Sequence, residues 1–240
     1  MAKKNDVYER APKFCLSYPD GTLKSFLIRQ GFVFAPMDKA EFIFFPGGAD
    51  INPFLYGERP HPKYMGNLKR DLQEIALLRC IPDNLFKIGV CRGAQLINVV
   101  LGNGRMYQHV TGHCQGPHRI YDTHIKGEGI MVTSVHHQMM IPGPSGCVLY
   151  AAAEATTKET FSEKIAIERG SGVLKLDDPE VIYYPEHNAI CWQPHPEYEH
   201  GPDSAHQRLF VETLETFCLT TSQQEARKEL AKAIQEERAV

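Results

Sequence analysis

A cysteine flanked by two glycines is the first feature of this sequence that could do chemistry. Cys91 lies in the segment "GVCRG" (residues 89–93), where an apolar run ends and a helix could begin. The pattern is typical of a nucleophile elbow, a strand-to-helix turn so tight that the neighbouring residues must be very small. A thiol at the start of a helix also meets backbone N–H groups and the positive end of the helix dipole, which favour the thiolate. Five residues alone fit equally a core cysteine beside two chance glycines.

A thiol nucleophile needs a base, and the base needs an acceptor that orients it. Among 11 histidines, His195 stands out because Glu197 follows it by two residues, after the apolar run "AICW" (189–192). Side chains two apart in an extended segment point the same way, so Glu197 could orient the imidazole. Alone, such a pair is more often solvated on the surface. Together with the earlier elbow it predicts a triad of Cys91, His195 and Glu197.

Acyl transfer also requires N–H donors for the oxyanion that forms on the carbonyl oxygen. The segment "FFPGGAD" (44–50) supplies a Gly-Gly turn at the carboxyl end of an apolar run, where the sites of α/β proteins gather. Gly47 or Gly48 could present one N–H group, and the backbone of Arg92 the other. Taken by itself, the segment is more often a plain turn after a strand.

Strand and helix patterns alternate along the chain, which predicts a three-layer α/β domain with a largely parallel central sheet and helices on both faces. We expect residues 1–220 to form this single domain and 221–240 to form a charged, solvated helical tail. A hairpin is expected between 180–185 and 188–194. The remaining predicted strands are 13–18, 32–36, 41–45, 85–90, 129–135 and 172–176, and the helices are 21–31, 70–80, 94–104 and 204–219.

Composition excludes several classes of function. The formal net charge of −3 argues against broad electrostatic binding of nucleic acid. No apolar stretch approaches the roughly 18 residues that a membrane span requires, and the charged N-terminus lacks the apolar core of a secretory signal. Seven cysteines without a CxxC pair argue against a disulfide framework or a zinc knuckle. A cytoplasmic protein with free thiols is therefore expected.

Four segments, in this order and spacing, resemble the class I glutamine amidotransferase superfamily. The closest similarity is to its γ-glutamyl hydrolase branch, which includes the γ-glutamyl-GABA hydrolases, and it covers about residues 35–215. It implies the flavodoxin-like fold of that superfamily. The segments are "FPGGADINPFLYGE" (45–58), "IGVCRGAQLINVVLG" (88–102), "VTSVHHQ" (132–138) and "QPHPEYE" (193–199).

The resemblance implies a reaction without a cofactor. Cys91 would attack the γ-carbonyl of glutamine or of a γ-glutamyl amide and form a γ-glutamyl thioester. His195, held by Glu197, would protonate the departing amine or ammonia and then activate water. The substrate-lining residues implied by the family motifs are Gln95, Ser134, His136 and His137.

Arg92, next to the cysteine, is typical of the hydrolase branch and favours a free-standing enzyme acting on a small molecule. Thr133 and Pro194 depart from the family, which often has Asn at the first position and usually an aromatic residue at the second. Residues 151–179 look longer and more polar than their equivalent, as a flap or partner surface would be. A glutaminase subunit feeding ammonia to a separate synthetase, a non-catalytic binding relative, and a homodimer all stay open.

Three further histidines invite a metal interpretation. Cys114 lies among His109, His113 and His118. However, their spacing matches no standard zinc pattern, and the chemistry above needs no metal. We therefore predict no metal site and expect surface or substrate-lining histidines here.

Overall fold

The computed structural model describes residues 2–110, 112–114, 116–125, 127–152, 178–198 and 204–238 of the chain, with side chains from Asp6 to Glu237 within these ranges. The strand predicted at 172–176, and nearly all of the segment 151–179, lie outside the described residues.

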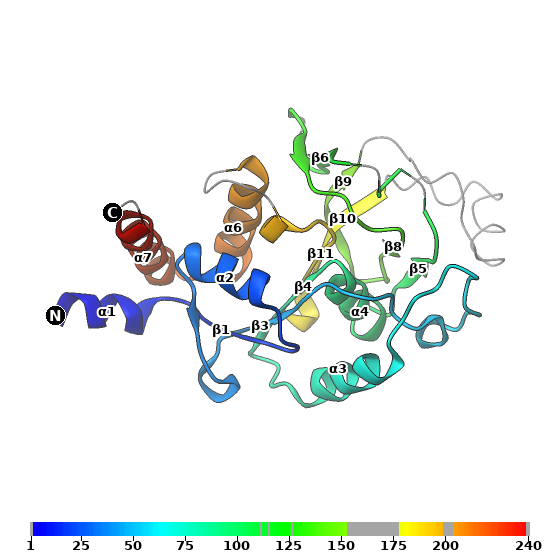
Figure 1. The fold of residues 1–240 in the computed structure, drawn as a ribbon, viewed down its shortest axis with the longest axis horizontal. Coiled ribbons are helices and arrows are strands. Elements are labelled where there is room, and N and C mark those ends of the chain that lie inside the picture. The colour runs from blue at the N-terminus through cyan, green and yellow to red at the C-terminus, as the bar shows by residue number, and fades with distance from the viewer. Residues whose placement is uncertain are drawn as a thin grey trace.

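Within the described residues, a nine-stranded sheet runs through the middle of the molecule (Figure 1). Its first five strands, in sheet order, are parallel: β2 (Val33–Phe34), β1 (Lys13–Leu16), β3 (Phe42–Phe45), β4 (Phe86–Val90) and β11 (Ala189–Trp192). Four antiparallel strands continue it: β10 (Asp178–Tyr184), β9 (Cys147–Ala152), β6 (His118–Asp122) and β7 (Ile130–Val132). A separate pair joins β5 (Arg105–Tyr107) and β8 (Met139–Ile141).

Helices cover both faces of the sheet because the central strands are apolar on both sides. Phe42 and Phe44 of β3 pack with α2 and α6, whereas Ile43 and Phe45 pack with α3 and α4. The predicted three-layer α/β fold is therefore confirmed. The helices are α1 (Ala2–Arg10), α2 (Gly21–Arg29), α3 (Leu68–Cys80), α4 (Arg92–Val100), α6 (Ala205–Cys218) and α7 (Thr221–Arg238). In the described part of the chain, no helix combines the length and apolarity needed to cross a membrane.

The predicted hairpin is confirmed: β10 and β11 pair antiparallel, with Tyr184 opposite Ala189. Other elements differ from the prediction. The first helix, α1, was not expected because its sequence is charged and carries almost no apolar periodicity. The stretch 103–130, rich in His and Gly, contributes β5 and β6 instead of only loops.

The C-terminal helix α7 is docked and not freely solvated. Ala226 and Leu230 are buried and pack against Val7 and Ala11 in and beside α1. Arg227 donates to the carbonyl of Gln30 at 2.7 Å and pairs with Glu215. The few apolar residues of α7 thus form a packing face, and they pack against a helix that the sequence analysis did not predict.

We expect Leu230→Ala to lower the free energy of unfolding by about 2–3 kcal/mol, because it removes a buried side chain between two helices. Lys232→Ala, on the same helix but 78% exposed, should change it by less than about 0.5 kcal/mol. Urea denaturation measures both. Equal effects would contradict the docking of α7.

Candidate active site

Cys91 occupies the turn between β4 and α4 in a strained backbone conformation. Its φ of 49° and ψ of −110° lie in a region that residues other than glycine rarely adopt. Its N–H group donates to the carbonyl of Trp192 at 2.8 Å. A Cβ atom on Gly93 would overlap the carbonyl of Phe45, and one on Gly89 would overlap the start of α4. Both glycines of the sequence motif are therefore required by packing, as an elbow demands.

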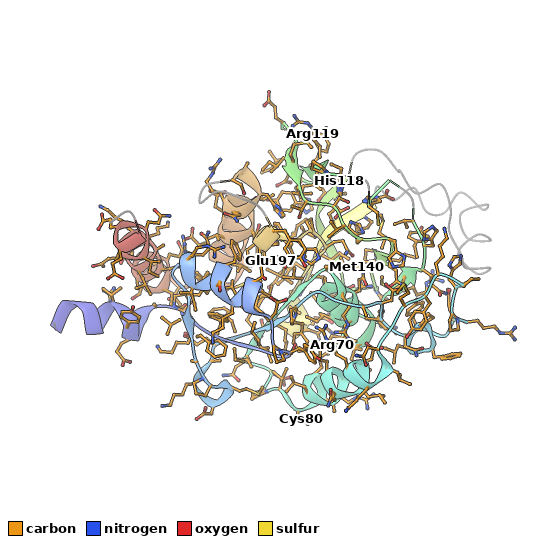
Figure 2. The ribbon with its side chains drawn as sticks, viewed as in Figure 1. Arg70, Cys80, His118, Arg119, Met140 and Glu197 are labelled. Atoms are coloured by element: carbon orange, nitrogen blue, oxygen red, sulfur yellow. The ribbon has the colours of Figure 1, made fainter. Side chains whose placement is uncertain are left out.

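His195 and Glu197 follow β11, the strand next to β4. Glu197 Oε1 lies 2.7 Å from His195 Nδ1, and the ring of Tyr198 stacks on the imidazole with 4.2 Å between centroids. Glu197 belongs to a short 3-10 turn that contacts α2 and α6, near the middle of the molecule (Figure 2). The thiol of Cys91 lies close enough to the imidazole to raise its pKa. The structure thus brings together the three residues that the sequence predicted as a triad.

Thr133 fixes the backbone of the histidine. Its hydroxyl accepts from the N–H of His195 and donates to the carbonyl of the same residue, each at 2.8 Å. The departure from the family's Asn therefore has a local use, because a hydroxyl can both donate and accept in one place.

The charge state of His195 is set by its neighbours. Burial lowers the pKa of His195, but the hydrogen bonds to Cys91 and Glu197 and their negative charges outweigh burial and raise it to about 10. The imidazole of His195 is therefore protonated at neutral pH. Such a ring can deliver a proton to a leaving amine.

The Gly-Gly turn after β3 lies against this base. A Cβ atom on Gly47 would sit 2.6 Å from Cε1 of His195, so only glycine allows the close approach. Gly48 has a φ of 146°, a conformation that side chains rarely adopt, and borders the side chains of Arg70 and Arg92. The backbone N–H of Arg92 is at the start of α4, directly after Cys91. Gly47 and Arg92 are thus close to the nucleophile and base.

A buried network of ion pairs and hydrogen bonds holds the Gly47–Gly48 turn in place. Arg70 donates to the carbonyls of Pro46 and Gly47, both at 2.9 Å. It also pairs with Glu74, and the Arg92 side chain pairs with Glu74 and Asp71. These two arginines and two carboxylates are all nearly inaccessible to solvent. Their charges balance, so the burial of each is compensated by direct hydrogen bonds.

The four residues predicted to line the substrate differ in placement. Gln95 Nε2 lies 3.2 Å from Oε1 of Gln193, inside the protein. Ser134 donates to the carbonyl of His113. His136 is buried beside Glu180, and the half-buried His137 pairs with Asp50 at 2.8 Å.

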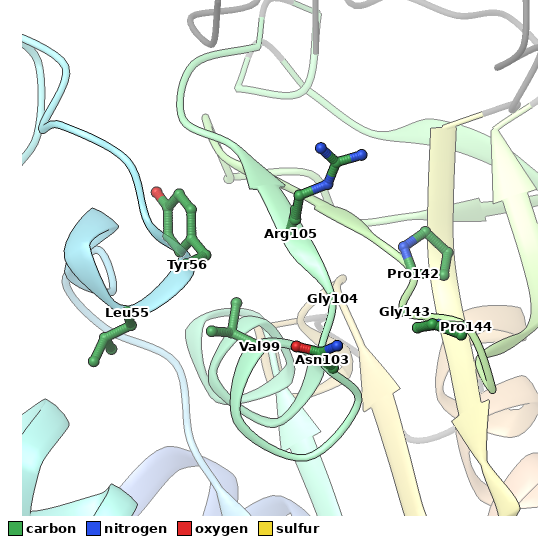
Figure 3. A pocket seen from close by; sticks show the side chains of 9 residues that line it. All are labelled: Leu55, Tyr56, Val99, Asn103, Gly104, Arg105, Pro142, Gly143 and Pro144. Atoms are coloured by element: carbon green, nitrogen blue, oxygen red, sulfur yellow. The ribbon is translucent and has the colours of Figure 1, made fainter. Parts of the chain in front are cut away.

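The pocket drawn in Figure 3 lies elsewhere. It has a volume of about 620 Å³ and its lining includes Leu55, Val99, Arg105 and Pro142. Val99 is near the C-terminal end of α4, whereas Cys91 precedes its first residue. Eight residues of helix separate the two by about 12 Å. We therefore do not assign this pocket to the chemistry of Cys91.

Sequence reasoning missed Arg70, Asp71 and Glu74, although an Arg-Glu pair at i, i+4 in α3 was an available signal. It also missed Glu180, a fully buried carboxylate in β10, which is rare unless the charge is paired.

The comparisons with known proteins identify the chain as a class I glutamine amidotransferase-like protein. The Peptidase C26 family model matches residues 30–168, a range that includes Cys91 and ends before His195. Protein NtpR of Enterococcus hirae is 33% identical over 198 residues, covering 73% of this chain and 74% of that protein. The chain therefore belongs to the Peptidase C26 family, and with it to the amidotransferase-type hydrolases.

Two further comparisons agree. The glutamine amidotransferase-like protein YvdE of Lactococcus lactis is 38% identical over 115 residues, which cover 39% of this chain and only about half, 48%, of that protein. A glutamine amidotransferase structure from Thermotoga maritima superposes with a TM-score of 0.53 at 13% identity, covering 94% of this chain and 95% of that one. At this identity the superposition shows the fold alone.

The raised pKa gives a direct test. We expect the His195 ring to titrate with a midpoint near pH 10 in side-chain NMR spectra. This pKa lies above the ordinary value near 6.5. The contribution of protonated His195 to the free energy of unfolding is therefore complete below pH 6.5 and is lost as pH rises through about 10. Cys91→Ser and Glu197→Gln should each lower the midpoint, since each removes a negative partner. Cys114→Ser should not. A ring already neutral at pH 7 in the unaltered protein would contradict the arrangement.

The close approach of Gly47 gives a second test. Gly47→Ala should slow alkylation of Cys91 by iodoacetamide by about tenfold or more, because the added methyl displaces the base that holds the thiolate. Gly21→Ala is the matched control, since nothing lies within 4 Å of the added Cβ. Mass spectrometry of the Cys91 peptide measures both rates. Equal rates would show that Gly47 does not constrain His195.

Proposed function

We propose that the protein is a cysteine hydrolase that cleaves the γ-glutamyl C–N bond of glutamine or of a γ-glutamyl amine. The observation that carries the proposal is the strained Cys91 at the start of α4, beside a histidine that Glu197 orients. A strained nucleophile with a base and an orienting acceptor is the common arrangement of covalent acyl-transfer enzymes.

In the first half of the reaction, the Cys91 thiolate attacks the γ-carbonyl carbon and a sulfur–carbon bond forms. The oxygen takes on negative charge, which the N–H groups of the Gly47–Gly48 turn and of Arg92 would stabilise. When the tetrahedral intermediate collapses, the carbon–nitrogen bond breaks. The imidazolium of His195 gives its proton to the departing nitrogen, and a γ-glutamyl thioester remains on Cys91.

In the second half, neutral His195 takes a proton from water while the oxygen of that water attacks the thioester carbon. The carbon–sulfur bond then breaks, glutamate leaves, and the thiolate–imidazolium pair is restored. Glu197 holds the ring in one orientation through both halves, so the same nitrogen serves first as the acid and then as the base. No metal or redox group takes part in these steps.

Within the site, the side chains of Gln95 and Ser134 contact other protein groups. We assign the γ-glutamyl group from the family and leave the amine side open between ammonia and an alkyl amine such as GABA. Arg92, whose side chain is committed to the buried network, would act on substrate only through its backbone N–H.

The test is intact-mass spectrometry after incubation with a diazoketone analogue of glutamine. The unaltered protein should gain one adduct, and Cys91→Ala should gain none. Cys114→Ala is the matched control: Cys114 is an exposed cysteine whose charge is close enough to that of Cys91 for the two to interact, and its loss should leave the adduct in place.

Release of ammonia from glutamine and of amine from γ-glutamyl-GABA, measured on the same samples, should cease in Cys91→Ala. An adduct without turnover of the isolated protein would favour the glutaminase subunit that awaits a synthetase. If neither the unaltered protein nor any variant gains an adduct, the proposed triad is contradicted. The remaining hypothesis is then a non-catalytic relative that only binds its ligand.

A further inference from the structure

A second group of histidines lies around a buried carboxylate that the proposed reaction does not use. Glu180 in β10 is fully buried, and three imidazoles surround its side chain, those of His113, His118 and His136. His113 and His136 are almost as inaccessible. The sequence predicted surface or substrate-lining histidines here, and it considered His109 together with His113 and His118. The structure instead separates His109 from the cluster and adds His136 and Glu180.

The distances within the cluster suit ligands around a common ion. His113 Nδ1 lies 3.3 Å from Oε1 of Glu180, and His136 Nε2 lies 3.6 Å from Oε2. Nitrogen and oxygen ligands about 2.0–2.1 Å from a tetrahedral ion are about 3.4 Å from one another. By contrast, a charge-assisted hydrogen bond brings the two heavy atoms to about 2.7–2.9 Å. Both carboxylate oxygens, and His136 Nε2, lack a hydrogen bond of acceptable geometry among the described residues.

In His113 and His136, the ring nitrogen that faces away from Glu180 is hydrogen-bonded, as it usually is in histidines that bind a metal. His113 Nε2 lies 3.1 Å from Oδ2 of Asp178, and His136 Nδ1 lies 2.9 Å from the carbonyl of Gln138. Histidines that bind metals usually donate the outer N–H to a carboxylate or a backbone carbonyl, which fixes the tautomer and turns the other nitrogen toward the ion. Both histidines meet this condition, one with each kind of acceptor.

The charge of the cluster also calls for a cation. Asp178 and Glu180 are both buried, and two buried carboxylates need positive charge close by. A proton competes for the same place: burial lowers the pKa of His113, but the neighbouring carboxylates of Asp178 and Glu180 raise it to about 9. The long contacts to His136 and the unsatisfied oxygens of Glu180 are better explained by an ion in the centre than by a proton on one ring.

We propose that His113, His136 and Glu180 bind one divalent metal ion of the zinc class, with His118 as the fourth ligand. His118 Nε2 lies 3.0 Å from Oε1 of Glu180, and its ring packs edge-on against His113 at 4.8 Å between centroids. Imidazole and carboxylate together suit zinc and its first-row neighbours better than magnesium or calcium. Four protein ligands leave no open position, so the ion is structural.

The ion would tie three segments together. His113 comes from the loop before β6, His136 from the segment that follows β7, and Glu180 from β10. The same segment after β7 carries Thr133, which holds the backbone of His195. The metal would therefore hold the catalytic histidine's support in place without contacting the substrate.

The experiment uses the full chain, purified without a histidine tag, and needs no substrate. Elemental analysis should find one equivalent of zinc per chain, and a strong chelator should remove it. Adding Zn²⁺ back should raise the thermal midpoint, because an ion that binds only the folded state stabilises it. Co²⁺ in place of zinc should give the intense visible absorption of a four-coordinate site.

Glu180→Gln and His136→Gln should each weaken Zn²⁺ binding by about 100-fold or more, since each removes a ligand. His124→Gln, at an exposed histidine outside the cluster, should retain the full affinity. If the two ligand variants fail to fold, the titration of the chelated unaltered protein with Zn²⁺ decides alone. Failure of that protein to bind Zn²⁺ below about 10 μM, or unchanged binding in folded Glu180→Gln, would overturn the proposal. Neither outcome bears on the reaction of Cys91.

Discussion

The tight turn between β4 and α4 is the constraint on which the rest of the site depends. It holds Cys91 in a conformation that costs about 1–3 kcal/mol, and surrounding contacts must keep it there. The N–H of Cys91 is bonded to Trp192 in the neighbouring strand, and Gly93 rests against Phe45 in the strand on the other side. The strain is therefore carried by the two strands that flank β4.

Those same two strands deliver the other parts of the site. In the sheet, β4 lies between β3 and β11, and all three are parallel. Their carboxyl ends consequently meet at one edge, where α/β proteins place their sites. The Gly47 turn follows β3 and His195 follows β11, so the Gly-Gly turn, Cys91 and His195 come from three adjacent strands. Arg70 donates to the carbonyl of Gly47, and Arg92 pairs with Glu74. These buried contacts fix the position of the glycine turn relative to His195.

The sequence was sufficient for the residues that act through local pattern. Gly89 and Gly93 predict the elbow because no other residue fits at these positions. The two-residue spacing of His195 and Glu197 in an extended segment places the two side chains on the same side, where they make contact. Periodicity likewise revealed the apolar strands. It could not reveal α1 or the docking of α7, since neither helix has a strong apolar face and each is stabilised by the other. Nor could it foresee Glu180, whose partners come from three segments that only the folded chain brings together.

The two carboxylate–histidine systems of this protein show why residue types alone do not determine chemistry. At His195, one carboxylate faces one imidazole at 2.7 Å, the distance of a strong hydrogen bond, and the far side of the ring meets a thiol. That ring is oriented and free to exchange a proton. At Glu180, one carboxylate faces three imidazoles, two of them at distances too long for strong hydrogen bonds, while two outer nitrogens are tied to other acceptors. The inner nitrogens of rings held in this way point toward one another and not toward a substrate. The first arrangement suits proton transfer, and the second suits the binding of a cation.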